Sequence, residues 1–94
     1  MVRDTTEGKI DYLLVRAGPM FERWAKHLTV SAESHGGKYN WMNADTEQDL
    51  QRFREGAARH FEQWLNGENA EDHAAAILFN INGAEYVRER LKRD

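Results

Sequence analysis

The sequence predicts an all-α fold, a compact bundle of three main helices that follows an irregular N-terminal segment. Three observations support this prediction. Apolar residues recur at intervals of three and four in three long segments, glycine follows the first two of these segments, and the only proline, Pro19, stands at the start of the first. A chain of 94 residues has room for one domain, which we take to span residues 1–94.

The N-terminal part has little to bury. Residues 1–9 contain almost no apolar side chains and are expected to form a flexible arm, and residues 10–15 are expected to be irregular. The first helix is predicted over residues 19–35. Phe21, Trp24 and Leu28 share one of its faces, and Gly36-Gly37 follow it, as glycine often follows a helix end.

The second helix is predicted over residues 46–65. Thr46 and Asp49 have the spacing of a capping box, and Asn66-Gly67 mark the end. The third helix is predicted over residues 70–91, and its middle, residues 74–79, is apolar on every side. A domain of this size buries only roughly 60 to 65% of its unfolded surface. We therefore expect a second subunit to cover part of the third helix, which makes the protein a homo-oligomer.

The composition excludes several classes of function. The chain is 40% hydrophobic and 31% charged, which excludes a disordered protein, and it has no cysteine, which excludes disulfides, thiolate metal sites and a cysteine nucleophile. A net charge of -3 argues against duplex nucleic acid as the partner. No apolar run approaches the ~20 residues of a membrane span, and no signal peptide is visible. We expect a cytoplasmic protein without a membrane partner.

Two polar residues interrupt an apolar stripe on the third helix. His73 and Asn80 fall in register with Ile77 and neighbouring apolar positions. A buried imidazole or amide without a partner costs roughly 1 to 3 kcal/mol, so each requires a hydrogen bond. Arg59 and His60 lie beside the stripe of the second helix, and we expect them to converge with His73 and Asn80 between the two helices. The cluster is either a hydrogen-bond network that sets helix register or a ligand site.

The loop over residues 36–43 carries a second candidate set. Lys38, Tyr39 and Trp41 offer a cation and two flat aromatic surfaces, which together suit a phosphate and a stacked base. The alternative is that the two aromatic side chains fold back onto the core.

A metal site is a third candidate. Glu68, Asp72 and His73 could bind magnesium or manganese. A metal site built from His60, Asp72 and His73 is a further possibility, although the adjacent Asp72 and His73 project about 100° apart on a helix. All-α pyrophosphohydrolases use two paired carboxylate motifs, and only Glu68-x-x-Glu71 is present here. We therefore assign no catalytic residue and no firm cofactor.

The order of several short motifs resembles a known family. The motifs are Gly37-Lys38-Tyr39, Asn40-Trp41, Arg59-His60, Gly67-Glu68, Asp72-His73-Ala74-Ala75 and Phe79-Asn80. They resemble the small, mostly phage-encoded domain described as dATP/dGTP diphosphohydrolase N-terminal. The resemblance implies a phage origin, and with it the cytoplasm of the host cell. It also implies that the family's polar positions are Lys38, Arg59, His60, Glu68, Asp72, His73 and Asn80. The family name reflects a position beside a hydrolase, so it does not imply that this domain is the catalyst.

We therefore expect a protein that binds a purine nucleotide without turnover, at a helix or subunit interface. Lys38 and Arg59 would meet phosphate, Tyr39 or Trp41 would stack the base, and His60, His73 and Asn80 would donate or accept hydrogen bonds. By a fold-level analogy, the protein is similar to phage sponges that sequester cyclic nucleotide signals of bacterial defence. The alternatives are a metal-dependent dATP/dGTP phosphohydrolase, an accessory domain of one, and a scaffold without a ligand.

Overall fold

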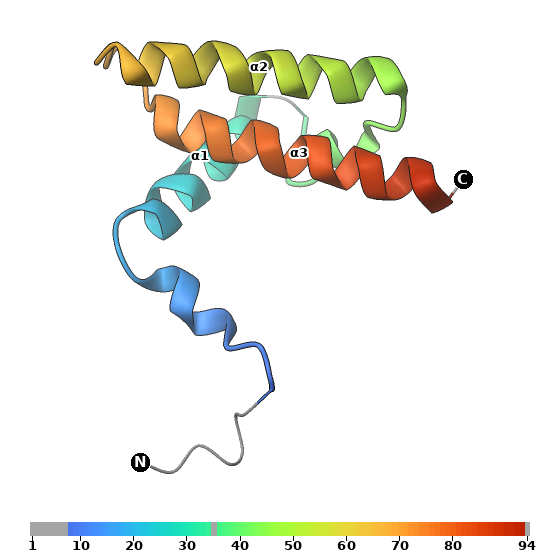
Figure 1. Ribbon diagram of the computed structural model, residues 1–94, viewed down its shortest axis with the longest axis horizontal. Helices are drawn as coiled ribbons and strands as arrows, with labels where there is room; N and C mark the ends of the chain where they lie inside the picture. The colour runs from blue at the N-terminus through green and yellow to red at the C-terminus, as the bar shows by residue number, and fades with distance from the viewer. Residues whose placement is uncertain (1–7, 35, 94) are drawn as a thin grey trace.

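The computed structural model describes residues 8–34 and 36–93. Its three α-helices are α1 (Met20–Ser34), α2 (Glu47–Leu65) and α3 (His73–Arg93), and two short 3-10 helices, η1 (Tyr12–Arg16) and η2 (Asn40–Asn43), precede α1 and α2 (Figure 1). The described residues contain no strand, so the all-α prediction is confirmed. None of the described helices is long and apolar enough to cross a membrane.

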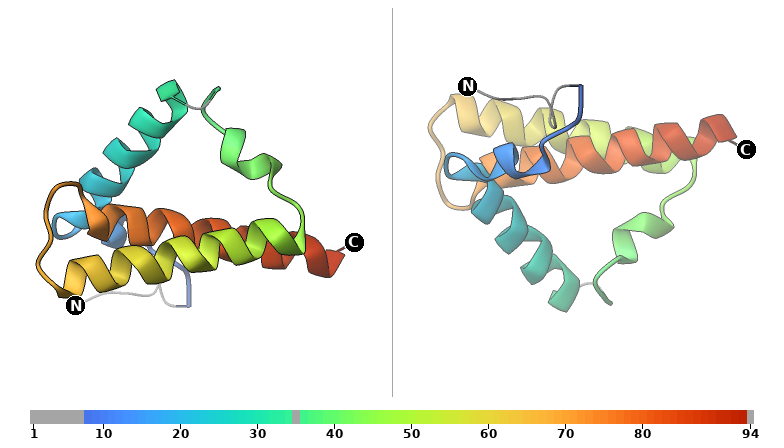
Figure 2. Two further views of the ribbon diagram at one scale, coloured as in Figure 1. Left: turned by 90° about the horizontal axis from the view of Figure 1, so that it is seen from above. Right: turned by 90° about the horizontal axis from the view of Figure 1, so that it is seen from below.

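Helix α3 is the centre of the fold. It lies antiparallel to α2 along most of its length, and the two form a helical hairpin, the α2–α3 hairpin. Helix α3 also contacts α1, which diverges from this hairpin (Figure 2). The imidazole of His27 on α1 lies 5.2 Å from the ring of Phe79 on α3, centroid to centroid. The sequence suggested that another subunit covers the second apolar side of α3. In the structure, α1 of the same chain occupies part of that side.

Local signals set the helix ends of the hairpin. Thr46 caps α2, because its hydroxyl accepts from the Asp49 N–H at 3.0 Å and the Asp49 carboxylate accepts from the Thr46 N–H at 3.2 Å. Gly67 follows α2 with φ 77°, and the Gly67 and Glu68 N–H groups donate to the carbonyls of Trp64 and Gln63. This is a Schellman ending, which satisfies carbonyls of the last turn and turns the chain towards α3.

The third helix begins later than the sequence suggested. It starts at His73 rather than at residue 70, because Asp72 is its cap and the Asp72 carboxylate accepts from the Ala75 N–H at 3.1 Å. It also continues to Arg93, two residues past the expected end. Helix α1 starts one residue after Pro19, and His35, its expected last residue, lies outside the described residues.

The core is small and lies between α2 and α3. Leu50, Ala84 and Val87 are buried there, and partly buried side chains such as Tyr86 surround them. The two helices approach closely where glycine faces a larger side chain: Gly83 on α3 meets the ring of Phe53, and Gly56 on α2 meets the amide of Asn80. A side chain at either glycine would overlap its neighbour.

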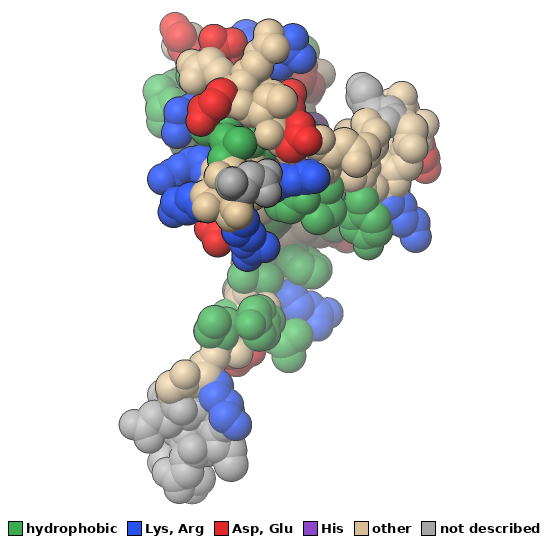
Figure 3. Space-filling model, turned by 90° about the vertical axis from the view of Figure 1, so that its right-hand side faces the viewer, with side chains coloured by type: hydrophobic (Ala, Val, Ile, Leu, Met, Phe, Trp, Pro, Cys, Tyr) green, Lys and Arg blue, Asp and Glu red, His purple; other side chains and the backbone are tan. Residues whose placement is uncertain are grey.

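The segment before α1 stands away from this core. Tyr12, Leu13, Leu14 and Val15 in η1 are each about two-thirds or more exposed, and hydrophobic side chains gather on this projecting segment in Figure 3. Most of the expected arm, residues 1–7, lies outside the described residues. The segment therefore leaves apolar surface uncovered within a single chain.

Candidate functional site

A pocket lies between α1, the loop after it and the α2–α3 hairpin. Its volume is about 390 Å³, within the roughly 300 to 1,000 Å³ of small-molecule sites. Five of the residues expected to bind a nucleotide line it: Lys38, Trp41, Arg59, His60 and Asn80. Residues from the loop, α2 and α3 thus meet at one cavity, although the sequence separates them by up to 42 positions, from Lys38 to Asn80.

The charge of the pocket is one-sided. Lys38 and Arg59 line it, and none of the described residues that line it is an aspartate or a glutamate. Within residues 8–34 and 36–93, neither cation has an ion pair with a carboxylate. Both side chains are exposed and therefore remain available to an anion. The lining suits a phosphate or another anionic group.

Aromatic rings form one wall of the pocket. Phe79 contacts the other two rings of this wall, His27 at 5.2 Å and Trp41, edge-on, at 6.3 Å between centroids. The ring of Phe53, which does not line the pocket, lies 6.0 Å from Phe79. Trp41 also packs edge-on against Tyr86 at 5.3 Å. Trp41 therefore folds back onto the hairpin and also lines the pocket. Its position is compatible with both predictions for the loop, packing on the core and lining a ligand site.

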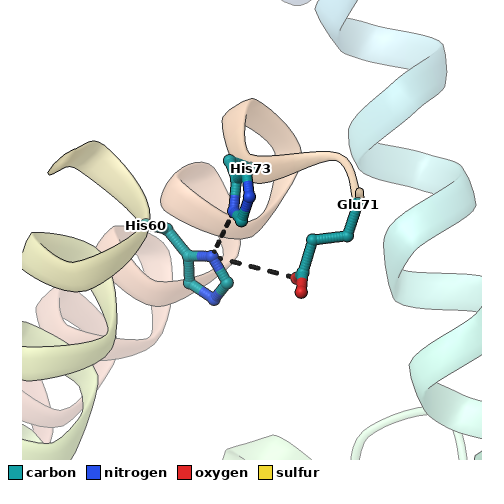
Figure 4. Close-up of side chains that lie close together, drawn as sticks. All are labelled: His60, Glu71 and His73. Carbon is teal, nitrogen blue, oxygen red and sulfur yellow. Dashed lines mark hydrogen bonds and ion pairs between the residues drawn. The ribbon is translucent and has the colours of Figure 1, made fainter. Parts of the chain in front are cut away.

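His73 is buried behind the pocket and connects two polar neighbours. Its side chain is 1% exposed, its Nε2 contacts the carboxylate of Glu68, and its Nδ1 lies 2.8 Å from Nδ1 of His60 (Figure 4). An ionised carboxylate only accepts hydrogen bonds, so Nε2 of His73 donates to Glu68. In a neutral His73 the other ring nitrogen then accepts from His60. The buried imidazole was expected to need a hydrogen-bond partner, and the structure gives it two, another histidine and a glutamate.

The surroundings change the acidity of this cluster. Burial lowers the pKa of the His60 imidazole, and the nearby Glu71 carboxylate opposes that change. The hydrogen bond from His73 lowers the pKa of Glu68, and a second bond from the Ala70 N–H acts in the same direction. His60 is therefore favoured as a neutral ring and Glu68 as an anion, which is the combination that the hydrogen bonds require.

Comparison with known proteins identifies the family. The family model described as dATP/dGTP diphosphohydrolase, N-terminal, matches residues 2–91 of the chain. The chain belongs to this family. Neither the curated proteins nor the solved structures contain a match. The resemblance inferred from the motifs is thus confirmed over nearly the whole chain.

Two of the residues expected in this domain's site lie elsewhere. Tyr39 is 70% exposed and borders a neighbouring groove instead of the pocket. Asp72 points to α1, where its two carboxylate oxygens bond Nε and one terminal nitrogen of Arg23 at 2.8 and 2.6 Å. Since neighbouring helix positions project about 100° apart, Asp72 faces Arg23 while His73 faces His60. The expected metal set of Glu68, Asp72 and His73 is therefore not brought together.

A different set of possible metal ligands is present. One ligand atom from each of His60, Glu71 and His73 lies within 4.8 Å of the other two. Mg²⁺ requires near-octahedral oxygen ligands, and two imidazoles with one carboxylate instead suit a transition metal. This donor set therefore fits magnesium and manganese, the two ions that the sequence suggested as possible, poorly.

The sequence did not assign His27, Glu71 or Phe79 to the site, although Glu71 and Phe79 lie in short motifs noted above. His27 and Phe79 line the pocket, and Glu71 lies beside His60. His27 meets the criterion that singled out His73, namely a polar residue on an apolar helix face. It lies three residues after Trp24, on the inner face of α1. Glu71 lies in a turn, where periodicity carries no signal.

Proposed function

We propose that this domain binds a purine nucleotide in the pocket between α1 and the α2–α3 hairpin. The observation that carries the proposal is the pocket lining, which in the described part of the chain has two exposed cations and no carboxylate. Lys38 and Arg59 would contact phosphate oxygens, as charge-assisted hydrogen bonds to phosphate are among the stronger polar contacts. The 390 Å³ volume suits a ligand of nucleotide size.

The remaining pocket residues would hold the base and the sugar. The wall made by Phe79, Trp41 and His27 offers flat apolar surface to a purine ring. Asn80 donates from its amide nitrogen to the Ala76 carbonyl at 2.8 Å and its amide oxygen lies against Gly56, so the second hydrogen of its amide nitrogen would be the group offered to a ligand. His60 lines the pocket with one ring nitrogen bonded to His73, which orients the imidazole. His73 itself would act through His60.

The proposed role is sequestration without turnover, as in a sponge for a cyclic nucleotide signal of bacterial defence. Two features favour binding over chemistry. Among the described residues, the pocket lining contains no carboxylate that could hold a magnesium ion, and the acidic residues of α2 and α3 do not form paired motifs. A signal nucleotide need only be held, and the cations and aromatic wall serve that purpose.

Calorimetric titration tests this proposal directly. Linear and cyclic purine nucleotides would be titrated into the protein with EDTA and, separately, with magnesium. We expect saturable heat with at least one nucleotide, and its affinity should fall as salt screens the phosphate contacts. No heat with any nucleotide at high protein concentration would refute the proposal.

The second candidate is a metal-dependent dATP/dGTP phosphohydrolase, or an accessory domain of one. The cluster of His60, Glu71 and His73 beside the pocket favours this candidate, and so does the family name. Chromatography of dATP and dGTP after long incubation with the protein and metal distinguishes this candidate from sequestration. Intact nucleotide that co-elutes with the protein supports sequestration, and nucleoside monophosphate supports hydrolysis.

We also propose that the protein is a homo-oligomer. The exposed apolar side chains of η1 lie beside α1, where Phe21 is 44% exposed and lines the same groove as Val15. Met20, Trp24 and other apolar residues also line this groove. Contiguous apolar surface of this kind commonly marks an interface. A second copy of the chain presents the same surface and can bury it symmetrically.

A further inference from the structure

We propose that His60, Glu71 and His73 form a binding site for one divalent transition-metal ion of the zinc type. Three distances carry the proposal: 2.8 Å between the two imidazole Nδ1 atoms, 3.9 Å from His60 Nδ1 to Glu71 Oε1, and a limit of 4.8 Å for the whole set (Figure 4). The site comes from two parts of the chain, since α2 supplies His60, while the end of the connection and the first residue of α3 supply Glu71 and His73.

The spacing fits tetrahedral coordination. With zinc–nitrogen and zinc–oxygen distances of about 2.0–2.1 Å, two ligands of a tetrahedron lie about 3.3 Å apart. The two nitrogens are about half an ångström closer than this, and the His60–Glu71 pair is about half an ångström wider. Small rotations of Glu71, whose side chain is 61% exposed, and of the two rings would close the difference.

Glu68 supplies the support that metal-bound histidines commonly have. Its carboxylate accepts from Nε2 of His73, and it is itself held by the Ala70 N–H at 2.6 Å. A carboxylate on the far nitrogen fixes the tautomer of a metal-bound imidazole and makes the ring a stronger donor. It leaves Nδ1 of His73 as the ligand atom, and this atom faces His60. Without metal, a proton lies between the two Nδ1 atoms, and an ion would take its place while His60 carries a proton on Nε2.

The ligand set also indicates the type of metal. Two histidines and one carboxylate are a ligand set of catalytic zinc sites, where a fourth position is left for water or a ligand. Such a set binds zinc, cobalt or nickel in preference to magnesium or calcium, which require oxygen. Because His60 also lines the pocket, the ion would lie next to the proposed anion site. The metal site nevertheless rests on its own residues and not on the nucleotide proposal.

The first experiment measures metal binding alone. The full chain, stripped with EDTA and dialysed, would be titrated with ZnCl₂ and with MgCl₂ by calorimetry. We expect one zinc ion per chain and no saturable heat with magnesium. Cobalt in place of zinc should give visible absorption bands of a nitrogen-ligated ion. Absence of saturable zinc binding would overturn the proposal.

Variants locate the ion. Glu71→Gln removes one ligand from an exposed position, so the fold should survive, and zinc affinity should fall at least tenfold. Glu68→Gln should weaken zinc by about 10- to 100-fold without removing a ligand. Glu62→Gln, an exposed carboxylate of α2, is the matched control and should leave the affinity unchanged. Zinc binding by Glu71→Gln at the wild-type affinity would place the ion elsewhere and overturn the assignment.

Nuclear magnetic resonance of the histidine rings gives an independent readout. Zinc should shift the Nδ1 signals of His60 and His73 and leave the ring of His27 without a ligand shift. Ligand shifts on neither His60 nor His73 would contradict the proposal, whatever the calorimetry shows.

Discussion

Arg23 on α1 and Asp72 at the start of α3 form a two-point ion pair, with nitrogen–oxygen distances of 2.8 and 2.6 Å. This pair joins α1 to the end of α3 that carries His73. The Asp72 carboxylate also caps α3 by accepting from the Ala75 N–H. One carboxylate therefore holds the start of α3 and the position of α1, which forms one side of the pocket.

Substitution of Asp72 should separate these two roles. Asp72→Ala removes the cap and the ion pair and should lower the free energy of unfolding by about 0.5 to 2 kcal/mol, as expected of a lost helix cap. Asp72→Asn keeps a capping oxygen and should lose less. Urea unfolding followed by circular dichroism measures both. Equal loss in the two variants would show that the cap contributes nothing.

The same pair predicts a pH dependence at low pH. The hydrogen bonds from Arg23 lower the pKa of Asp72 to about 2, below its ordinary value of 3.8. A carboxyl group with a lowered pKa in the folded state stabilises the fold above its unfolded pKa, and this contribution is lost as the pH falls. Between about pH 4 and pH 2, wild type should therefore lose more stability than Asp72→Asn. Thermal unfolding in EDTA over this range tests the difference, and parallel curves would contradict it.

Gly56→Ala should destabilise the hairpin. A Cβ at Gly56 would lie 2.5 Å from the Asn80 amide oxygen and 2.9 Å from its carbon, so the helices must separate or Asn80 must move. We expect a loss of about 1 to 3 kcal/mol. Helix propensity alone predicts a gain of about 1 kcal/mol for this change. The sign of the change in the free energy of unfolding, measured with urea, therefore decides between steric overlap with Asn80 and the helix propensity of alanine.

One control variant and one double variant test whether the contact with Asn80 causes this loss. Gln51→Ala, at an exposed position of α2, should change stability little. Adding Asn80→Ala to Gly56→Ala should recover part of the loss, because it removes the atoms that the new methyl group meets. A double variant as unstable as the sum of the single variants would contradict the contact.

Removal of the pocket cations should weaken nucleotide binding. Arg59→Gln or Lys38→Gln should each reduce affinity about tenfold or more, since hydrogen bonds to charged groups contribute roughly 1.5 to 3 kcal/mol. Arg54→Gln removes an exposed cation of the same helix that does not line the pocket and should leave affinity unchanged. Calorimetry with the nucleotide that binds wild type best measures all three. An equal effect of Arg54→Gln would show nonspecific attraction only.

Charge placed on the projecting apolar segment should break the oligomer. Leu14 is 71% exposed, so Leu14→Glu should not disturb the fold of one chain. We expect light scattering after size exclusion to give a multiple of 11.0 kDa for wild type and 11.0 kDa for the variant. A wild-type monomer at high concentration would contradict the proposed interface.

The sequence by itself determined the three helices and the local signals at their ends. Periodicity, the Thr46–Asp49 capping box and Gly67 act within a few residues, so they can be read without the fold. It also singled out Lys38, Arg59, His60 and Asn80, which line the pocket, because polar residues beside apolar stripes and in an aromatic loop require an explanation wherever they lie.

Only the tertiary structure decided which of these residues meet. Asp72 and His73 are adjacent in sequence, yet the packing of α1 against α3 directs the first to Arg23, and the packing of α2 directs the second to His60. Glu71 enters the candidate metal site through the turn before α3, whose path depends on the angle between two helices. Contacts of this kind, between residues of different helices, depend on how the helices pack. The periodicity of one segment shows which of its own residues share a face, and it carries no information about what that face contacts.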